Sequence, residues 1–374
     1  MNDRNNQRIS DVENSTINQA QRDVVVYNGL GAADVIAIVN KVVALELSQY
    51  SHNAEQKLEE RLSHFSGKLV EKLAQKVSDK IDRFNEPSLQ FAVREAAIGY
   101  IKSGADDVEE NLVDLMIERV KVAEHSTMQQ LVDQAIKVIP TLSSETLALL
   151  TILTFRQLTF RGTKSEYLKW IAAVDSIVNV LTTVSTLDIE YLIQAGCAVG
   201  LTGLRANKKW EEMCRTNADL LFRHPATEEA VNTFLSSIGI QIMENGGGYT
   251  SVRNDNLGKK VILFLATAMI EVPSLKIGFN VVSSNTIDEI IRQEGLEIVR
   301  APFMTLRDSQ LIFSDEGVVS FFEKINPNWR KAIELLNSNR MISLTLTPVG
   351  TYIGSRRLSK LSGREIPMDI FYHD

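Results

Sequence analysis

The sequence predicts a mainly α protein with a short β-prone segment at its front and a smaller α+β domain at its end. Helical periodicity without proline runs from residue 34 to 85, and short alternating stretches occur only before residue 30 and after residue 240. The 8 prolines and 20 glycines in 374 residues agree with a high helix content. We expect a β-prone oligomerisation segment over residues 1–30, a long amphipathic helix over 31–86, a helical domain over 87–240 and a winged-helix-like α+β domain over 241–374.

The opening segment contains two β-prone runs, Thr16–Ala20 and Val24–Tyr27, and the turn signal Asn28-Gly29 closes the second. A two-stranded hairpin alone is marginally stable in water. Such strands therefore need other strands to pair with, and the nearest supply is the same segment in other copies of the chain. The side chains expected to take part are Ile17, Val24, Val26 and Tyr27.

The next stretch predicts a long helix that begins with Asp34 as N-cap and ends at Asn85, before Glu86-Pro87. From Leu58 to Phe84 its apolar residues recur about every 3.7 residues, close to the hendecad value. A helix of about 50 residues would be about 75 Å long, so it needs a partner helix from the rest of the chain or from another subunit. A break at residues 48–55 would instead give two shorter helices. Its expected oligomerisation positions are Val35, Ile38, Val42 and Leu45.

Residues 88–240 are expected to form several further helices, with boundaries at Ser103-Gly104, Pro140 and Ser143-Ser144. The acidic residues from Asp106 to Glu110 suit the first turn of a helix, where they complement its dipole, so we do not assign them to a metal.

Beyond residue 240 we expect strands at 240–243, 296–299 and 341–346, and helices at 315–325 and 328–337. Residues 262–270 are compatible with a helix or a buried strand. Pro348 sits at a first helical turn and Ser362-Gly363 at the helix end. This order of strand, Thr-Pro and closing helix is similar to the end of a winged-helix-like module.

The composition is that of a globular protein, with 44% hydrophobic and 23% charged residues, and it limits the functional classes. A net charge of -7 does not favour polyanion binding unless basic residues gather locally. Cys197 and Cys214 are too few for a four-ligand zinc site, and we expect buried free thiols. The polar N-terminus lacks the apolar region of a secretory signal, and no run reaches the roughly 18 apolar residues of a membrane span. We therefore expect a soluble, cytoplasmic protein.

No recognisable catalytic or cofactor motif is found. Gly246–Gly248 followed by Gly258-Lys259 lacks the spacing of a P-loop and the Ser or Thr after its lysine. The five histidines form neither HExxH nor HxH, and there is no GxSxG. We therefore expect no enzyme, no metal and no cofactor.

One basic cluster stands out near the C-terminus, because the stretch from residue 340 to 364 contains five positive residues and no acid. One interpretation is that this end complements an acidic surface of another subunit, and the alternative is contact with a phosphate backbone. These candidate ligand-binding or nucleic-acid-binding residues are Arg340, Arg356, Arg357, Lys360 and Arg364.

Several short motifs are spread over nearly the full length: Asn14–Ala20, Val24–Leu30, Phe84–Gln90, Asp188–Leu192 with Gly196-Cys197, and Leu346–Gly350. In these motifs the chain resembles a bacterial family known by the locus prefixes LPO and Vpar. The opening segment also resembles the front of several bacterial defence and conflict proteins, with Val12-Glu13 where those usually have Gly-Asp. The resemblance implies an anti-phage or conflict setting with an assembly role for the front segment, and it carries no catalytic residues.

We therefore expect a non-enzymatic sensor or effector that works as a homo-oligomer and binds a ligand, or a partner protein encoded in the same operon. One alternative is a nucleic-acid-binding regulator that uses the basic C-terminal helix. Another is an effector that perturbs membranes after activation, although charged residues interrupt both of the most apolar runs.

Overall fold

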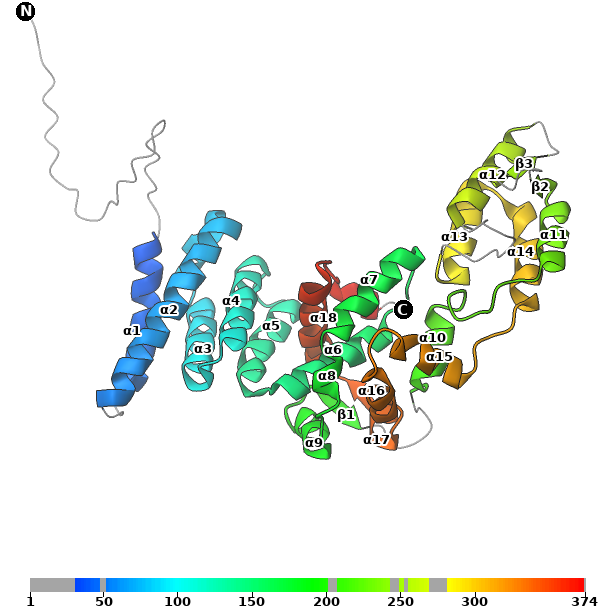
Figure 1. The fold of residues 1–374 in the computed structure, drawn as a ribbon. Coiled ribbons are helices and arrows are strands. Elements are labelled where there is room, and N and C mark those ends of the chain that lie inside the picture. Colours follow the sequence, from blue (N-terminus) through cyan, green and yellow to red (C-terminus); the bar gives the residue numbers. More distant parts are fainter. Residues whose placement is uncertain are drawn as a thin grey trace, which may run out of the picture. The chain divides into compact units, whose positions relative to one another are not determined.

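The computed structural model describes residues 31–47, 52–200, 207–242, 249–251, 255–268 and 281–372, and over these residues the protein is mainly α (Figure 1). The expected mainly α fold class is confirmed. The chain forms two compact units, residues 1–141 and residues 142–374. The division at residue 141 differs from the expected boundaries at 86 and 240, because the amphipathic helix packs with the helices that directly follow it.

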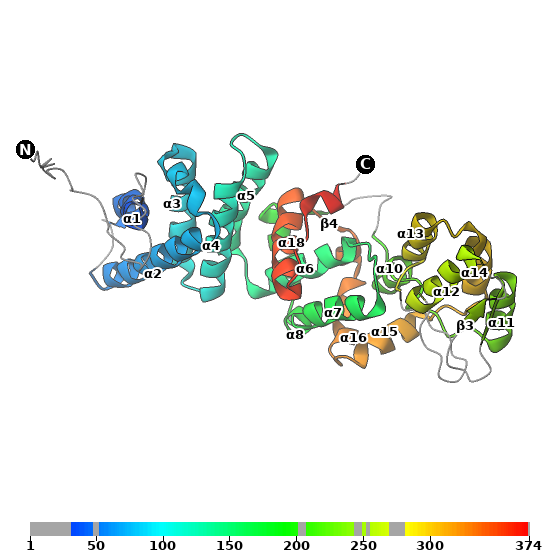
Figure 2. The same cartoon turned by 90° about the horizontal axis from the view of Figure 1, so that it is seen from above.

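Unit 1 is a stack of helices in which each helix packs on the next and on the next but one (Figure 2). This nearest-neighbour pattern is typical of stacked helical hairpins. Its helices are α1 (Ala32–Leu47), α2 (His52–Lys76), the 3-10 helix η1 (Ser78–Asn85), α3 (Pro87–Ser103), α4 (Asp106–Lys121), α5 (Thr127–Val138) and the 3-10 helix η2 (Ile139–Thr141).

The expected single helix over residues 34–85 is wrong, and the alternative of shorter helices is the one that the structure shows. The stretch is divided into α1, α2 and η1, and α1 packs against α2, which a continuous straight helix could not do. The helical backbone of α2 also ends at Val77, whose φ and ψ of -150° and 36° are not helical.

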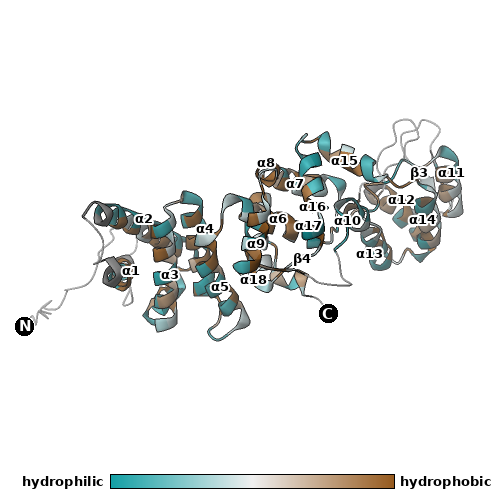
Figure 3. Ribbon diagram, turned by 90° about the horizontal axis from the view of Figure 1, so that it is seen from below, coloured by the Kyte–Doolittle hydropathy of each residue, from teal (hydrophilic) through white to brown (hydrophobic). Residues whose placement is uncertain are grey.

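The apolar stripe of α2 is covered within unit 1. Phe65, Leu69 and Leu73 are almost fully buried, and α2 packs on α1, α3 and α4. In Figure 3 the hydrophobic residues of these helices gather where the helices face one another. Of the two expected sources of a partner helix, the rest of the chain is the one that the structure shows for this stripe, so the stripe gives no argument for assembly.

Unit 2 has a body built around α6, a helix in which every residue from Thr146 to Arg156 is buried. The C-terminal helix α18 packs on α6, and Gly354 permits this close approach because a Cβ there would collide with Thr154 and the Leu150 carbonyl. The elements of the body are α6 (Ser144–Gln157), α7 (Lys164–Asp175), α8 (Val178–Leu181), α9 (Thr186–Gln194), β1 (Ala198–Gly200), α10 (Trp210–Asn217), α15 (Asp315–Glu323), α16 (Trp329–Leu336), α17 (Asn339–Ile342), β4 (Leu344–Leu346), α18 (Pro348–Ser362) and the 3-10 helix η3 (Met368–Phe371).

The residues between α10 and α15 are an insertion in the sequence of this body, and they form a hydrophobic core of their own. Val231, Phe264, Ile287 and Phe303 contribute to this core. The chain enters this insertion and leaves it through paired segments, since the backbone N–H of Phe313 donates to the carbonyl of Phe222 at 2.9 Å. Its elements are α11 (Glu228–Ser237), β2 (Ile240–Ile242), β3 (Tyr249–Ser251), α12 (Asn256–Ala268), α13 (Ser284–Glu294) and α14 (Glu297–Ser309).

The described residues do not form the winged-helix-like domain expected over 241–374. β4 pairs antiparallel with β1, with Ala198 opposite Leu346, and β2 pairs with β3. The last third of the chain is thus divided between the insertion and the body. The strand expected at 296–299 is wrong, because Leu296 precedes α14 and the next three residues begin that helix.

Two of the expected helix starts are confirmed by side chains that cap them, whereas Asp34, expected as an N-cap, lies in the first turn of α1. The Ser143 hydroxyl accepts from the N–H of Thr146 at 3.2 Å, and the Thr347 hydroxyl accepts from the N–H of Gly350 at 3.2 Å. Gly363 ends α18 with a φ of 67°, a left-handed conformation that favours glycine. The strand at 240–242 is also confirmed, whereas Met341 and Ile342 belong to α17 instead of a strand.

Candidate functional site

The basic residues predicted near the C-terminus lie on or beside α18, but they are not a free cationic face. Arg340 forms an ion pair with Glu190 of α9, and Arg364 forms one with Glu166 of α7 at 3.2 Å. The acids come from segments distant in sequence, so the local charge of +5 that the sequence suggests is reduced in the fold.

The other three predicted cations also interact with the protein. The Arg356 guanidinium lies 5.9 Å from the centroid of the Tyr352 ring, within the range of a cation–π contact. Arg356 and Arg357 are half-buried, and Lys360 is exposed. All three have interactions within the protein, so their charges are partly engaged.

The predicted oligomerisation residues are only partly described. Ile17, Val24, Val26 and Tyr27 lie outside the described residues, as does the side chain of Leu45. Val35 is 1% exposed and faces the interior of unit 1, whereas Ile38 and Val42 are half-buried at the flank of α1. Val35 thus stabilises unit 1 itself, and of the predicted positions on α1 whose side chains are described, Ile38 and Val42 keep exposed apolar surface.

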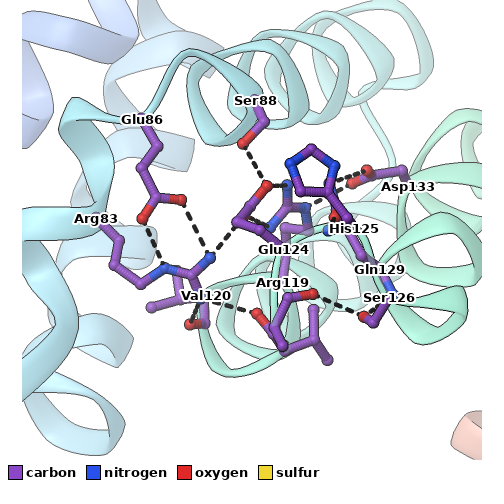
Figure 4. Close-up of polar contacts among 12 residues, drawn as sticks. Arg83, Glu86, Ser88, Arg119, Val120, Glu124, His125, Ser126, Gln129 and Asp133 are labelled. Atoms are coloured by element: carbon purple, nitrogen blue, oxygen red, sulfur yellow. Dashed lines mark hydrogen bonds and ion pairs between the residues drawn. The ribbon is translucent and has the colours of Figure 1, made fainter.

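A polar network in unit 1 was not anticipated from the sequence (Figure 4). The carboxylate of Glu124 accepts from Arg83 at 2.6 Å and from Arg119 at 2.8 Å, and it also accepts from the Ser88 hydroxyl. Hydrogen bonding to Arg119 lowers the pKa of Glu124 to about 2. Arg119 is fully buried and also donates to Asp133 at 2.8 Å, so this network joins the loop after α4 to η1, α3 and α5.

One acid of the cluster at the start of α4, Glu109, is likewise held by basic side chains of the protein. Glu109 is fully buried and accepts from Lys68 at 2.9 Å, and it lies 2.7 Å from His64 Nδ1. Hydrogen bonding to Glu109 raises the pKa of Lys68. Glu109 therefore links α4 to α2, which is a structural role.

Unit 2 contains a surface recess of about 370 Å³ between α10, α15 and α16. Its most deeply buried carboxylate, Glu211, accepts from the Asn337 amide at 2.8 and 2.9 Å, and Arg330 donates to Glu316 at 2.6 Å. Hydrogen bonds to Glu323 and Glu316 raise the pKa of Arg330. The charged side chains Glu211, Glu316 and Arg330 in this recess are thus already paired with other side chains of the protein. The recess is lined by Glu211, Asp315, Glu316, Val319, Arg330, Ile333, Glu334 and Asn337.

Both cysteines, Cys197 and Cys214, are buried free thiols, as expected from the sequence. Burial raises the pKa of Cys197 to about 11 and that of Cys214 well above its usual value. A thiol that stays protonated is a poor nucleophile, because the thiolate is the reactive form.

A protein-family model matches residues 29–372 of the chain. The chain belongs to this family. The description of the family names no activity and no ligand. The family match covers both units but begins at Gly29, so the β-prone residues 12–28 lie outside it, and it does not bear on a link to defence systems. No curated protein and no solved structure matches the chain.

Among the helices that the structure describes, none is both long enough and apolar enough to cross a lipid bilayer.

Proposed function

We propose that the protein is a non-enzymatic bacterial anti-phage or conflict-system component, a sensor or an effector, that acts as a homo-oligomer and binds a ligand or a partner protein. The observation that carries the assembly part is the position of α1 at the end of the unit 1 stack, where the described residues place helices on one side of it only. In stacked helical arrays an inner helix is covered by neighbours on both sides, whereas an end helix has a neighbour on one side only. Apolar residues on its outer face therefore need a cover.

The side chains of α1 support this role. Within the described residues, α1 packs on α2 and α3, which cover Val35, Val39 and Val43. Ile38 and Val42 continue the apolar surface beside that contact and are only half-buried. Residues 12–29 directly precede α1, so their β-prone runs and the α1 flank would be covered together when copies associate.

The setting in bacterial defence rests on the resemblance of the opening segment to the front of defence and conflict proteins. The non-enzymatic role is supported by the carboxylates and thiols that could act as catalytic groups, because each is paired with another side chain or kept protonated. Glu109 and Glu124 are engaged in ion pairs, and burial keeps both thiols protonated.

Light scattering tests the assembly proposal. The full chain is expected to have a multiple of the monomer mass, and a chain that starts at Gly31 is expected to have a lower mass. Ile38→Lys with Val42→Lys should have the same effect, because burying a lysine in an apolar contact is costly. Leu187→Lys is the matched control, since Leu187 is 76% exposed in unit 2 and its replacement should leave the mass unchanged. A full chain that stays monomeric at every concentration would refute self-assembly.

The nucleic-acid alternative has less support, because Arg340 and Arg364 are ion-paired and the other three cations are engaged in the protein. Its test is binding of duplex DNA that weakens with salt and with charge reversal at Arg356 and Arg357.

A further inference from the structure

The surface recess between α10, α15 and α16 contains a buried carboxylate that no cation balances. Glu211 lines the recess and is 6% exposed, and both of its oxygens accept from the same amide nitrogen of Asn337, at 2.8 and 2.9 Å. This amide is neutral, and within the described part of the chain no cation forms an ion pair with Glu211. A carboxylate has about four acceptor sites, so one amide group leaves part of its hydrogen-bonding capacity unused and its charge uncompensated.

The other charged groups of the recess do not supply the missing cation. Arg330, the base among the described residues of the lining, donates to Glu316 at 2.6 Å and to Glu323 at 2.6 Å, so two acids share it. Asp315 is paired with an arginine of α10 at 2.6 Å, and Glu334 forms no hydrogen bond or ion pair within the described residues. The lining and the groups paired with it thus hold five carboxylates and two guanidinium groups, a net charge of -3 with all of them ionised.

The recess also offers room and apolar surface. Its volume of about 370 Å³ lies at the lower end of the range for ligand pockets. Val319 and Ile333 belong to its lining and are 7% and 2% exposed, so an aliphatic group can pack on them. The acids do not form a metal-binding group among the residues that the structure describes, which favours an organic cation over a metal ion.

Arginine combines the two features that this lining requires. Its side chain has an aliphatic stem that packs on apolar surface and a cationic head. Its planar guanidinium donates two parallel hydrogen bonds to one carboxylate and is more weakly hydrated than an ammonium group, so it is easier to transfer to a buried acid.

We propose that this recess binds an arginine side chain of a partner protein, with the guanidinium on Glu211 and the stem on Val319 and Ile333. Glu334, which is exposed, adds negative charge that attracts the cation before the contact forms. The inference rests on the partner-binding part of the proposed function, for which it supplies a chemistry, and it does not depend on self-assembly.

Titration of the full chain with N-acetyl-arginine amide, an arginine residue without neighbours, tests the proposal. The indole N–H signals of Trp210 and Trp329 in an NMR spectrum report on the recess, because these residues directly precede Glu211 and Arg330. Trp170 on α7 is the internal reference. A single residue makes few contacts, so we expect a dissociation constant on the order of 1 mM. N-acetyl-lysine amide should bind more weakly, because its ammonium lacks the planar fork.

The decisive variant is Glu211→Gln, because it removes the charge and keeps an acceptor for the Asn337 amide. It should weaken binding at least about tenfold, while without ligand it should be as stable as the wild type or more stable, since a desolvated charge is removed. A Glu211 whose charge only stabilises the fold would instead lower the unfolding midpoint and leave binding by the folded protein unchanged. Glu334→Gln should weaken binding by no more than about fivefold, because the position is exposed. Glu365→Gln is the matched control at an exposed acid outside the lining and should leave binding unchanged.

The proposal is overturned if the arginine derivative causes no saturable shift of the Trp210 or Trp329 signal, or if Glu211→Gln binds it as tightly as the wild type. Tighter binding of free arginine than of N-acetyl-arginine amide would assign the recess to the free amino acid and would overturn the claim of a partner protein. A lower oligomer mass in Glu211→Gln would place an arginine of a second copy in the recess and would overturn the claim of a separate partner. A monomeric wild-type mass in light scattering would refute self-assembly and leave the titration unaffected.

Discussion

Replacement of Gly354 by alanine should destabilise unit 2. A Cβ on Gly354 would lie well inside 3.0 Å of both Thr154 Oγ1 and the carbonyl oxygen of Leu150. Thr154 could rotate, but the Leu150 oxygen belongs to the backbone of α6 and cannot. Because non-bonded atoms prefer separations of about 3.5 Å or more, α18 would have to move away from α6 by roughly 1 Å.

The size of the effect follows from two opposing contributions. Overpacking of this kind costs up to about 3 kcal/mol, and the better helix propensity of alanine returns about 1 kcal/mol. We therefore expect Gly354→Ala to lower the free energy of unfolding by about 2 kcal/mol. Urea unfolding followed by tryptophan fluorescence measures this in unit 2, as a lower midpoint with an unchanged slope.

Gly317→Ala provides the matched control in the same unit. The nearest atom to a Cβ at this position in α15 lies at 3.4 Å, which is an ordinary contact. The control should be neutral or should stabilise by up to about 1 kcal/mol. If Gly354→Ala unfolds at the wild-type midpoint, the close approach of α6 and α18 is not a constraint and the packing argument is wrong.

Three further predictions concern a partly buried ion pair, a strained backbone position and an exposed ion pair. The pKa of Glu124 is about 2 in the folded protein against 4.5 for a free glutamate, so the stability that Glu124 contributes is present above pH 4.5 and is lost as the pH falls toward 2. Glu124→Gln should therefore reduce the loss of unfolding free energy between pH 4.5 and 2, measured by circular dichroism. An unchanged pH dependence in this range would contradict the role of Glu124. His125 has a φ of 59°, so His125→Gly should raise the free energy of unfolding by roughly 0.5–1 kcal/mol, whereas a decrease would show that the side chain stabilises the loop. The exposed pair Arg340–Glu190 should show a coupling of at most about 1 kcal/mol in a double-mutant cycle, and a larger value would mean that the pair is not screened by solvent.

The sequence was informative where short-range chemistry decides the structure. The caps Ser143 and Thr347 and the terminal glycine Gly363 were predictable, because each acts on backbone groups within a few residues. The apolar spacing of α2 also indicated correctly which face is buried. It could not say which helices cover that face, since covering helices in the same chain and in another subunit require the same pattern.

The error at residues 296–299 has a similar origin. Four alternating residues suggested a strand, but Val299, Phe303 and Leu306 are the positions that α14 buries, at helical spacings of four and three. A longer window would have favoured a helix, although Pro302 within it argues against one. Alternation over so few residues is compatible with either structure.

The candidate sites were harder to predict, because their residues come together only in the fold. The acids that pair with Arg340 and Arg364 lie 150 and 198 positions away along the chain. Glu211 is similar, since the residue is visible in the sequence but its contact with Asn337 is not. Charge summed over a short stretch therefore overestimates a basic surface and overlooks a single buried carboxylate.

In unit 2 the last helix of the chain packs against the first helix of the unit, so the C-terminal residues belong to the same hydrophobic core as α6. Because α6 is buried from Thr146 to Arg156, it needs cover from several sides, and α18 supplies the most extensive of these contacts. β4 pairs with β1, although about 145 residues separate them along the chain, so residues 344–362 complete a structure that begins at residue 144. A fragment of residues 241–374 would retain the apolar faces of α18 and β4 without their partners, and the cost of exposing them is about 25 cal/mol for each Å² of apolar surface. The C-terminal residues are thus the closing part of unit 2.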